Sequence, residues 1–344
     1  MKKSYFLLIA TITVLCFAYP NSTSGQAKGN KVPAIEKKTL ENWVNHLSSD
    51  TMKGRKNGSP EMKTASEWIA GKFKEAGLKP FKGYKDYIQH YSFKSWRGND
   101  LIKESNVIGY IEGSDPKLKK EYIVITAHFD HVGLGRPVDG DSIYNGANDN
   151  ASGTCAVIAV AKTLNLMNAK PARSIIFAAF SGEELGMQGS RYFADHCPVP
   201  VASFYLNINF EMLGHCKVLG EKRFMITGPQ TDNLASILHA YNKDKEWKLI
   251  DTVKNLSKLF FASDNISFAL FKKEKDFSYG IPAHTFVIWN GEDHLHKPKD
   301  EAKYFNFDNY QNFIQYISGA ALYLSDCKTP IKWKSEKFKK LTVE

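Results

Sequence analysis

Apolar residues along this chain gather into short runs that alternate with longer segments of helical periodicity. Short runs rich in β-branched and aromatic residues predict buried strands at 87–95, 106–112, 122–127, 173–180, 202–210 and 283–289. Longer segments with an apolar residue every three or four positions predict helices at 33–48, 60–76, 154–166, 231–241 and 309–324. Because strands and helices alternate, we expect an α/β fold, a three-layer sandwich doubly wound around a mostly parallel central sheet.

Polar residues begin abruptly where the predicted strand at 122–127 ends. His128, Asp130 and His131 follow its last apolar residue, and a glycine-rich loop then leads to Asp149, shortly before the helix at 154–166. Ligands of open α/β sheets bind at the carboxyl ends of the strands. An imidazole at a strand end and a carboxylate before a helix can therefore converge on one point.

Three further strand predictions end in the same kind of residue. Glu183 and Glu184 follow the strand at 173–180, Glu211 follows 202–210, and His296 follows 283–289. Two imidazoles with several carboxylates and no nearby cysteine suit zinc or another first-row divalent ion. These residues are enough for two ions if one carboxylate bridges them, and such a pair can polarise a carbonyl and acidify a shared water.

The adjacent glutamates favour a division of labour. Their side chains point in different directions, so one can bind metal while the other acts as general base. Asp130, two residues after His128, is placed to accept the second ring N–H of that histidine. Each residue alone also has an ordinary explanation, since acidic pairs stabilise helix N-termini and Asn148–Ser152 resembles a helix cap. Their recurrence at four strand ends favours a metal centre.

The first residues have the pattern of an export signal. Lys2 and Lys3 precede an apolar run, and small residues at 22–25 resemble a cleavage zone, so we expect a signal peptide at 1–25. The apolar run is too short to span a bilayer, and the bulky Leu15 before Cys16 argues against a lipoprotein signal. We expect a periplasmic or secreted protein without a stable membrane anchor.

The remaining residues, 26–344, are expected to form one domain with N-terminal helices, because 43% hydrophobic residues suffice for one large core. The net charge of +10 comes partly from lysines at 328–340, a solvated tail rather than a nucleic-acid site. Cys155 reads as a buried thiol. Cys197 and Cys216 could form a disulfide in an oxidising compartment, although the sequence leaves the pairing open.

Together these residues form a set of motifs that resembles the co-catalytic zinc exopeptidases of the bacterial leucyl aminopeptidase and glutamate carboxypeptidase family, metallopeptidase family twenty-eight. The resemblance spans roughly Leu40 to Leu324 and implies the phosphorylase/hydrolase-like fold of zinc aminopeptidases. The motifs are His128-Phe129-Asp130, Gly146–Gly153, Phe180–Gly186, Asn209–Gly214 and His296–Asp300.

The resemblance implies a role for each matching residue. His128 would bind the first zinc, Asp149 would bridge both ions, and Glu184 and His296 would bind the second. Glu183 matches the general base and Asp130 the orienting carboxylate. Glu211 stands where the family usually has Asp as the remaining ligand of the first zinc, so its extra methylene could still reach that ion or weaken the site. Ser263-Asp264-Asn265 also departs from the usual Ser-Asp-His.

The implied activity is that of an exported di-zinc aminopeptidase, in which a metal-bound water activated by Glu183 attacks the first peptide bond of a substrate with a free N-terminus. Two alternatives share the fold: a single-zinc glutaminyl cyclase-like acyltransferase, and a non-catalytic binding protein. Dipeptidase and carboxypeptidase action would use the same metal core. The sequence leaves side-chain preference and oligomeric state open.

Overall fold

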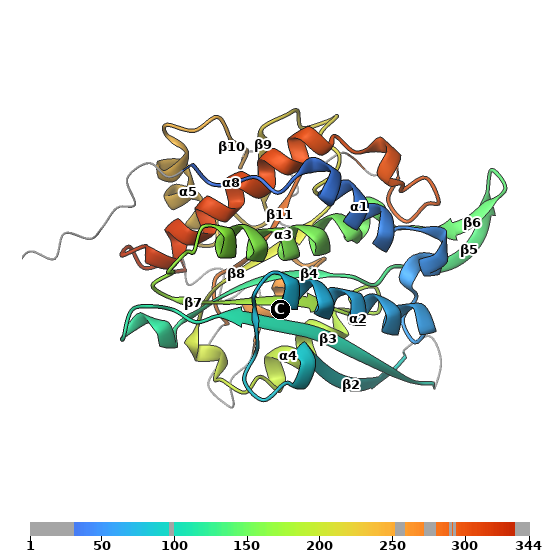
Figure 1. The fold of residues 1–344 in the computed structure, drawn as a ribbon, viewed down its shortest axis with the longest axis horizontal. Helices are drawn as coiled ribbons and strands as arrows, with labels where there is room; N and C mark the ends of the chain where they lie inside the picture. Colours follow the sequence, from blue (N-terminus) through green and yellow to red (C-terminus); the bar gives the residue numbers. More distant parts are fainter. Residues whose placement is uncertain are drawn as a thin grey trace, which may run out of the picture. The chain divides into compact units, whose positions relative to one another are not determined.

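Among the described residues of the computed structural model, nine strands form one central sheet (Figure 1). The model describes residues 31–95, 100–251, 259–271, 280–288, 291 and 294–333, so the signal peptide predicted at 1–25 and the lysines after Trp333 lie outside it. The strands are β1 (Lys79–Pro80), β2 (Ile88–Lys94), β3 (Leu101–Ile111), β4 (Tyr122–His128), β7 (Ser174–Phe180), β8 (Phe204–Glu211), β9 (Arg223–Ile226), β10 (Lys248–Leu249) and β11 (Ala283–Val287).

The parallel strands lie together in the middle of the sheet. The strand order is β1-β3-β7-β4-β8-β11-β9-β10, with β2 paired to β3, and the neighbours from β7 to β11 are parallel. Antiparallel pairs flank them, β3 with β7 on one side and β9 with β11 on the other. The expected α/β sandwich is confirmed, with a mixed sheet. Its four central strands bring their carboxyl ends to one edge.

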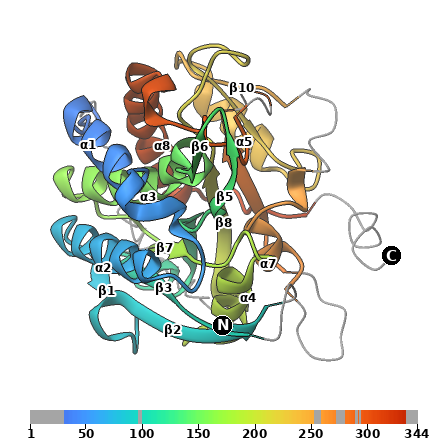
Figure 2. The ribbon, with the colours of Figure 1, turned by 90° about the vertical axis from the view of Figure 1, so that its right-hand side faces the viewer.

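Helices cover both faces of the sheet (Figure 2). One face carries α1 (Lys37–Leu47), α2 (Pro60–Glu75), α3 (Ser152–Leu166), α5 (Leu234–Asn242) and α8 (Phe307–Asp326), and the other carries α4 (Gln188–Asp195) and α7 (Asn265–Ala269). Side chains of β4 alternate between the faces: Ile123 and Ile125 pack in the first core, Tyr122 and Val124 in the second. Each helix within the described ranges is too short or too polar to cross a bilayer.

Two local expectations need correction. The glycine-rich segment after His131 contains a hairpin, β5 (Gly133–Val138) and β6 (Asp141–Tyr144), in which Leu134 and Val138 are exposed and Ile143 and Tyr144 are only partly buried, so it shows no buried alternation. Cys155, Cys197, Cys216 and Cys327 are all free thiols, so Cys197 and Cys216 form no disulfide. Cys197 packs against the core on the α4 side and Cys216 in the core on the α3 side, with the sheet between them.

A fully buried arginine joins the segments that surround the end of β4. Arg55, the last residue of the 3-10 helix Asp50–Arg55, donates hydrogen bonds to the carbonyl oxygens of Leu47 (2.5 Å), Phe129 (2.6 Å), Asn145 (2.8 Å) and Gly146 (2.8 Å). The planar guanidinium can serve several acceptors at fixed angles, which an ammonium cannot. Arg55 therefore holds the end of α1, the segment after β4 and the turn before Asp149 in one arrangement.

We expect Arg55→Lys to lower the free energy of unfolding by about 3 kcal/mol, because a lysine leaves buried carbonyl oxygens without a donor at a cost of about 1–3 kcal/mol each. Urea unfolding followed by circular dichroism measures the change. Arg136→Lys, at an exposed position in β5, is the matched control and should stay within about 0.5 kcal/mol of the parent chain. Equal losses in the two variants would contradict the role given to Arg55.

Candidate metal centre

The acidic and imidazole residues predicted from the strand ends come together at the carboxyl edge of the central strands. His128 and Glu211 are the last residues of β4 and β8, and Glu183 and Glu184 follow β7, the neighbour of β4 on its other side. Asp149 lies in the turn Ala147–Ala151 that leads into α3. His296, in the segment after β11, reaches the same edge and has the only half-exposed side chain among these ligand candidates.

Four side chains surround one point at this edge. His296 Nε2 lies 3.1 Å from both Asp149 Oδ2 and Glu184 Oε1. His131 Nδ1 lies 3.0 Å from Glu184 Oε1 and 3.5 Å from Asp149 Oδ2. The four donor atoms are within 4.8 Å of one another, which is close enough to hold a metal ion. The sequence motifs assigned no ligand role to His131, although this residue belongs to the polar group that follows β4.

A second group surrounds the other oxygen of Asp149. His128 Nε2 lies 3.3 Å from Asp149 Oδ1, and Glu211 forms a group with these two residues in which one ligand atom of each lies within 4.8 Å of the others. The two oxygens of Asp149 thus face different groups, as a bridging carboxylate requires. The longer side chain of Glu211 reaches its group. Glu183 is adjacent, with Oε2 4.0 Å from His128 Nε2.

The donor set fits a divalent metal ion. His128 Nε2 is buried, points at carboxylates and has no hydrogen-bond partner, so a bound cation would satisfy a nitrogen that otherwise stays orphaned. The groups consist of imidazole and carboxylate, which are ligands of zinc and other first-row divalent ions. Several carboxylates crowd there with little solvent, and a cation would offset their mutual repulsion.

Asp130 contacts different atoms from those expected. Its carboxylate accepts hydrogen bonds from the backbone N–H groups of Glu183 and Glu184 (3.1 Å each) and from Asn57 Nδ2 (2.7 Å). His128 Nδ1 instead lies nearer the backbone carbonyl oxygen of Asp130, at 3.2 Å, than its carboxylate, at 3.7 Å. The carboxylate of Asp130 therefore orients the glutamate pair, while its main chain orients the histidine.

Asp300, the last residue of the His296 motif, positions Asp149. Its two carboxylate oxygens accept the backbone N–H groups of Asn148 (2.8 Å) and Asp149 (2.9 Å). Burial raises the pKa of Asp300 to about 6, although these two hydrogen bonds lower it. The segment carrying His296 and the turn carrying Asp149 are thereby joined through the main chain as well as through the ligand atoms.

Burial and neighbouring charges shift the pKa values of the side chains in the centre in opposite directions. Burial would raise the pKa of Asp149, but His128, His296 and His131 hold it well below its usual range. Hydrogen bonds to Asp149 and Glu184 raise the pKa of His296 to about 10. Burial raises the pKa of Glu183 well above that of an exposed glutamate, despite the opposing charge of His128. Glu183 therefore holds a proton more tightly than Asp149 does.

Asp264 adds another buried carboxylate beside the centre. Burial raises its pKa to about 6, and its charge in turn raises the pKa values of Glu183 and Glu211. The neighbouring Asn265, which departs from the usual histidine, donates to the carbonyl oxygen of Phe260 (3.0 Å) and accepts from Thr285 Oγ1 (2.9 Å). Asn265 therefore makes a supporting contact within the α7 segment.

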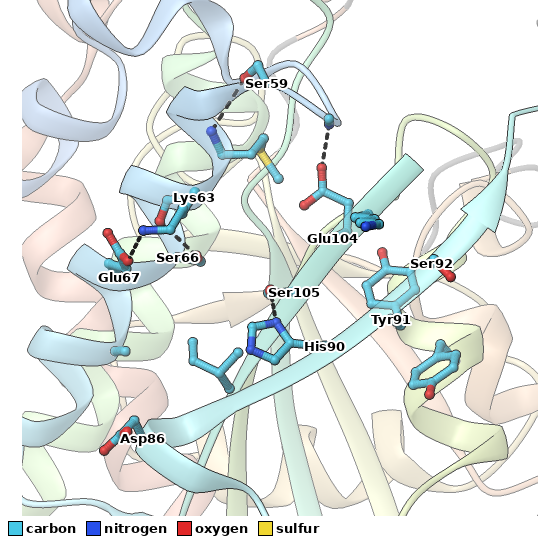
Figure 3. A pocket seen from close by; sticks show the side chains of 16 residues that line it. Ser59, Lys63, Ser66, Glu67, Asp86, His90, Tyr91, Ser92, Glu104 and Ser105 are labelled. Atoms are coloured by element: carbon cyan, nitrogen blue, oxygen red, sulfur yellow. Dashed lines mark hydrogen bonds and ion pairs between the residues drawn. The ribbon is translucent and has the colours of Figure 1, made fainter. Parts of the chain in front are cut away.

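A cavity of about 1130 Å³ lies apart from the metal centre, between α2 and the hairpin of β2 and β3 (Figure 3). None of the ligand candidates lines it. Glu104 in its wall is 7% exposed and accepts the backbone N–H of Gly58 at 2.6 Å. Burial raises the pKa of Glu104 to about 7. One link between the cavity wall and the centre is Asn57, which precedes Gly58 and donates to Asp130.

Comparison with known proteins gives one family and one fold. The model of peptidase family M28 matches residues 106–321. Leupeptin-inactivating enzyme 1 of Streptomyces exfoliatus is 23% identical over 208 residues, 60% of this chain and 42% of that protein, so the chain spans less than half of this curated relative.

Two solved structures show the similarity of fold. The zinc aminopeptidase BSAP of Bacillus subtilis has a TM-score of 0.62 at 17% identity and covers 90% of this chain and 97% of its own. Glutaminyl cyclase of Porphyromonas gingivalis has a TM-score of 0.61 at 16% identity, over 85% of this chain and 99% of its own. At such low sequence identities, the similarity to these two structures shows the fold alone.

The raised pKa of Glu104 predicts that stability falls as pH rises. The unfolded chain loses this proton near pH 4.5 and the folded chain near pH 7, so the free energy of unfolding decreases between these values and levels off above them. Glu104→Gln, whose amide oxygen can still accept the Gly58 N–H, should be more stable than the parent by up to about 3 kcal/mol at pH 8 and by much less at pH 5.

Urea unfolding at both pH values tests this expectation, since other titrating groups cancel in the difference between variant and parent. Glu67→Gln, on an exposed position of the same cavity wall, is the matched control and should show no such difference. A stability difference for Glu104→Gln that is the same at pH 5 and pH 8 would contradict the assignment.

Proposed function

The chain belongs to peptidase family M28, and on that premise we propose that it is an exported di-zinc metallopeptidase that acts as an aminopeptidase. The observation that carries the proposal is the placement of Asp149, whose two carboxylate oxygens face two separate groups of ligand side chains. Peptides with a free N-terminus are the proposed substrates.

The proposed centre assigns a place to every ligand expected from the sequence. His128, Asp149 and Glu211 would hold the first ion, and Asp149, Glu184 and His296 the second. Zinc at these positions would polarise the scissile carbonyl, acidify water and stabilise developing negative charge on oxygen. The remaining chemistry is proton transfer by this chain's own residues.

Glu183 is the proposed general base. Its carboxylate lies beside His128 and belongs to neither of the two ligand groups, so it is free to face the substrate. It would take a proton from the attacking water as the carbon–oxygen bond forms, and return it to the amine nitrogen as the peptide bond breaks. Asp130 fixes the backbone of Glu183 at 3.1 Å.

The same proposal covers the rest of the chain. Residues 1–25 would direct export to the periplasm or medium, and residues 26–344 would form the single peptidase domain; no nucleic-acid partner is proposed. The described residues Val32 onward pack as one unit, which supports the second part. Sequencing the N-terminus of the exported protein would test the first part, and a mature chain that begins at Met1 would contradict it.

Glu211 favours one alternative, a single-zinc glutaminyl cyclase-like acyltransferase. Burial raises its pKa to about 7, so a proton competes with metal for this carboxylate and could leave the first ion site empty. Incubation with a peptide that begins with glutamine separates the two functions. Release of ammonia with formation of a pyroglutamyl end, without cleavage, would favour the alternative.

We expect Glu183→Gln to lower peptide hydrolysis by at least about 100-fold while zinc content is unchanged, because the amide cannot accept the proton of water. The assay compares aminoacyl chromogenic substrates with their N-acetylated forms, and elemental analysis counts the metal. Glu67→Gln, an exposed glutamate on α2, is the control for the same chemical change. Full activity in Glu183→Gln would remove this residue from the mechanism.

Glu211→Ala should reduce bound zinc from two ions per chain to one, since only the first group loses a ligand. Elemental analysis after equilibration with limiting free zinc measures the count. Parent-like zinc content in the variant would show that Glu211 is not a ligand, and loss of both ions would show that the two sites are not independent.

A further inference from the structure

His131 and His296 stand in the same relation to the two carboxylates between them. Each presents one ring nitrogen to Glu184 Oε1 and to Asp149 Oδ2, at 3.0 and 3.5 Å for His131 and at 3.1 Å to each for His296. Four ligands bonded at about 2.0–2.1 Å to a tetrahedral ion lie about 3.3 Å from one another. These four distances therefore match four of the six edges of one tetrahedral zinc site.

The ring of His131 is held in this position from behind. Its backbone N–H donates to the carbonyl oxygen of Arg55 at 3.1 Å, and its side chain is fully buried. A Cβ atom at Gly146 would lie 2.5 Å from His131 Cγ, so only glycine leaves room for the imidazole there. Arg55 in turn binds the carbonyl oxygen of Gly146. A ligand fixed in this way costs little ordering when metal binds.

We propose that His131 is a fourth protein ligand of the zinc held by Asp149, Glu184 and His296. The proposal rests on the metal centre of the proposed function and adds a residue that the family resemblance does not assign. The second site then has two imidazole and two carboxylate ligands, which completes a tetrahedral shell. The first site has three protein ligands, His128, Asp149 and Glu211, and keeps a position open beside Glu183.

This asymmetry has a measurable consequence for metal loading. A site with four prepared ligands binds zinc more tightly than one with three, so the first equivalent of zinc should enter the His131 site. At one equivalent, X-ray absorption spectra should therefore show two imidazole ligands per zinc. One imidazole ligand per zinc is expected instead if the zinc occupies the His128 site, or if it occupies the second site without His131 as a ligand.

Two substitutions separate a ligand from a residue that merely orients Glu184. His131→Asn retains an amide N–H that can donate to Glu184 but is a poor zinc ligand, and His131→Ala removes both functions. Competition titration of the apoprotein with zinc should show the tight Kd weakened by more than about 100-fold in both variants, beyond the 10- to 100-fold typical of losing a residue that only contacts a ligand. His90→Ala, an exposed histidine bonded to Ser105, is the control.

One imidazole per zinc in the parent chain at one equivalent would overturn the proposal without reference to any variant. A parent-like Kd in His131→Asn, with a weakened Kd in His131→Ala, would also overturn it and make His131 a positioning residue. These readouts do not depend on catalysis. Two imidazoles with no peptide hydrolysis would refute the proposed peptidase function alone, whereas hydrolysis with one imidazole would refute only the role of His131.

Discussion

The structure depends on gathering several carboxylates at one poorly solvated edge of the sheet. Asp149, Glu183, Glu184 and Glu211 lie there together, and grouped buried negative charges are costly unless each finds a compensating partner. Part of the compensation comes from the imidazoles that face them. A divalent cation would compensate the remaining negative charge, and the buried nitrogen of His128 that has no hydrogen-bond partner would be one of its ligands.

The side chains of three residues behind the ligands, Asp130, Asp300 and Arg55, form hydrogen bonds with main-chain groups around the centre. Asp130 holds the backbone of Glu183 and Glu184, Asp300 holds that of Asn148 and Asp149, and Arg55 holds four carbonyl oxygens. Main-chain anchoring leaves the ligand side chains free to meet an ion. These hydrogen bonds also join segments that lie far apart in the chain, from the end of α1 to Asp300 before α8.

The two groups of ligands are chemically unequal although they share Asp149. One contains His128 and Glu211, with Glu183 and Asp264 nearby, and its carboxyl groups have raised pKa values. The other contains two imidazoles, His131 and His296, which lower the pKa of Glu184 against the effect of burial and, together with His128 of the first group, lower that of Asp149. The first environment favours proton transfer and the second favours tight retention of a cation. Under the proposed function, the two tasks would lie on opposite sides of a single carboxylate, that of Asp149.

The sequence alone was enough to predict the fold class and the gathering of the candidate ligands at one edge of the sheet. Both follow from local pattern, namely buried strands of the right length with polar residues at their carboxyl ends. Other features depended on the tertiary structure. The sheet lies between Cys197 and Cys216, Leu134 and Val138 of β5 are exposed, and His131 lies beside His296 although 165 positions separate them. Asp130 likewise found backbone partners across the turn after β7. Sequence pattern fixes which face a residue occupies within its own element, whereas its neighbours from other elements depend on strand order and loop path, which only packing of the whole chain decides.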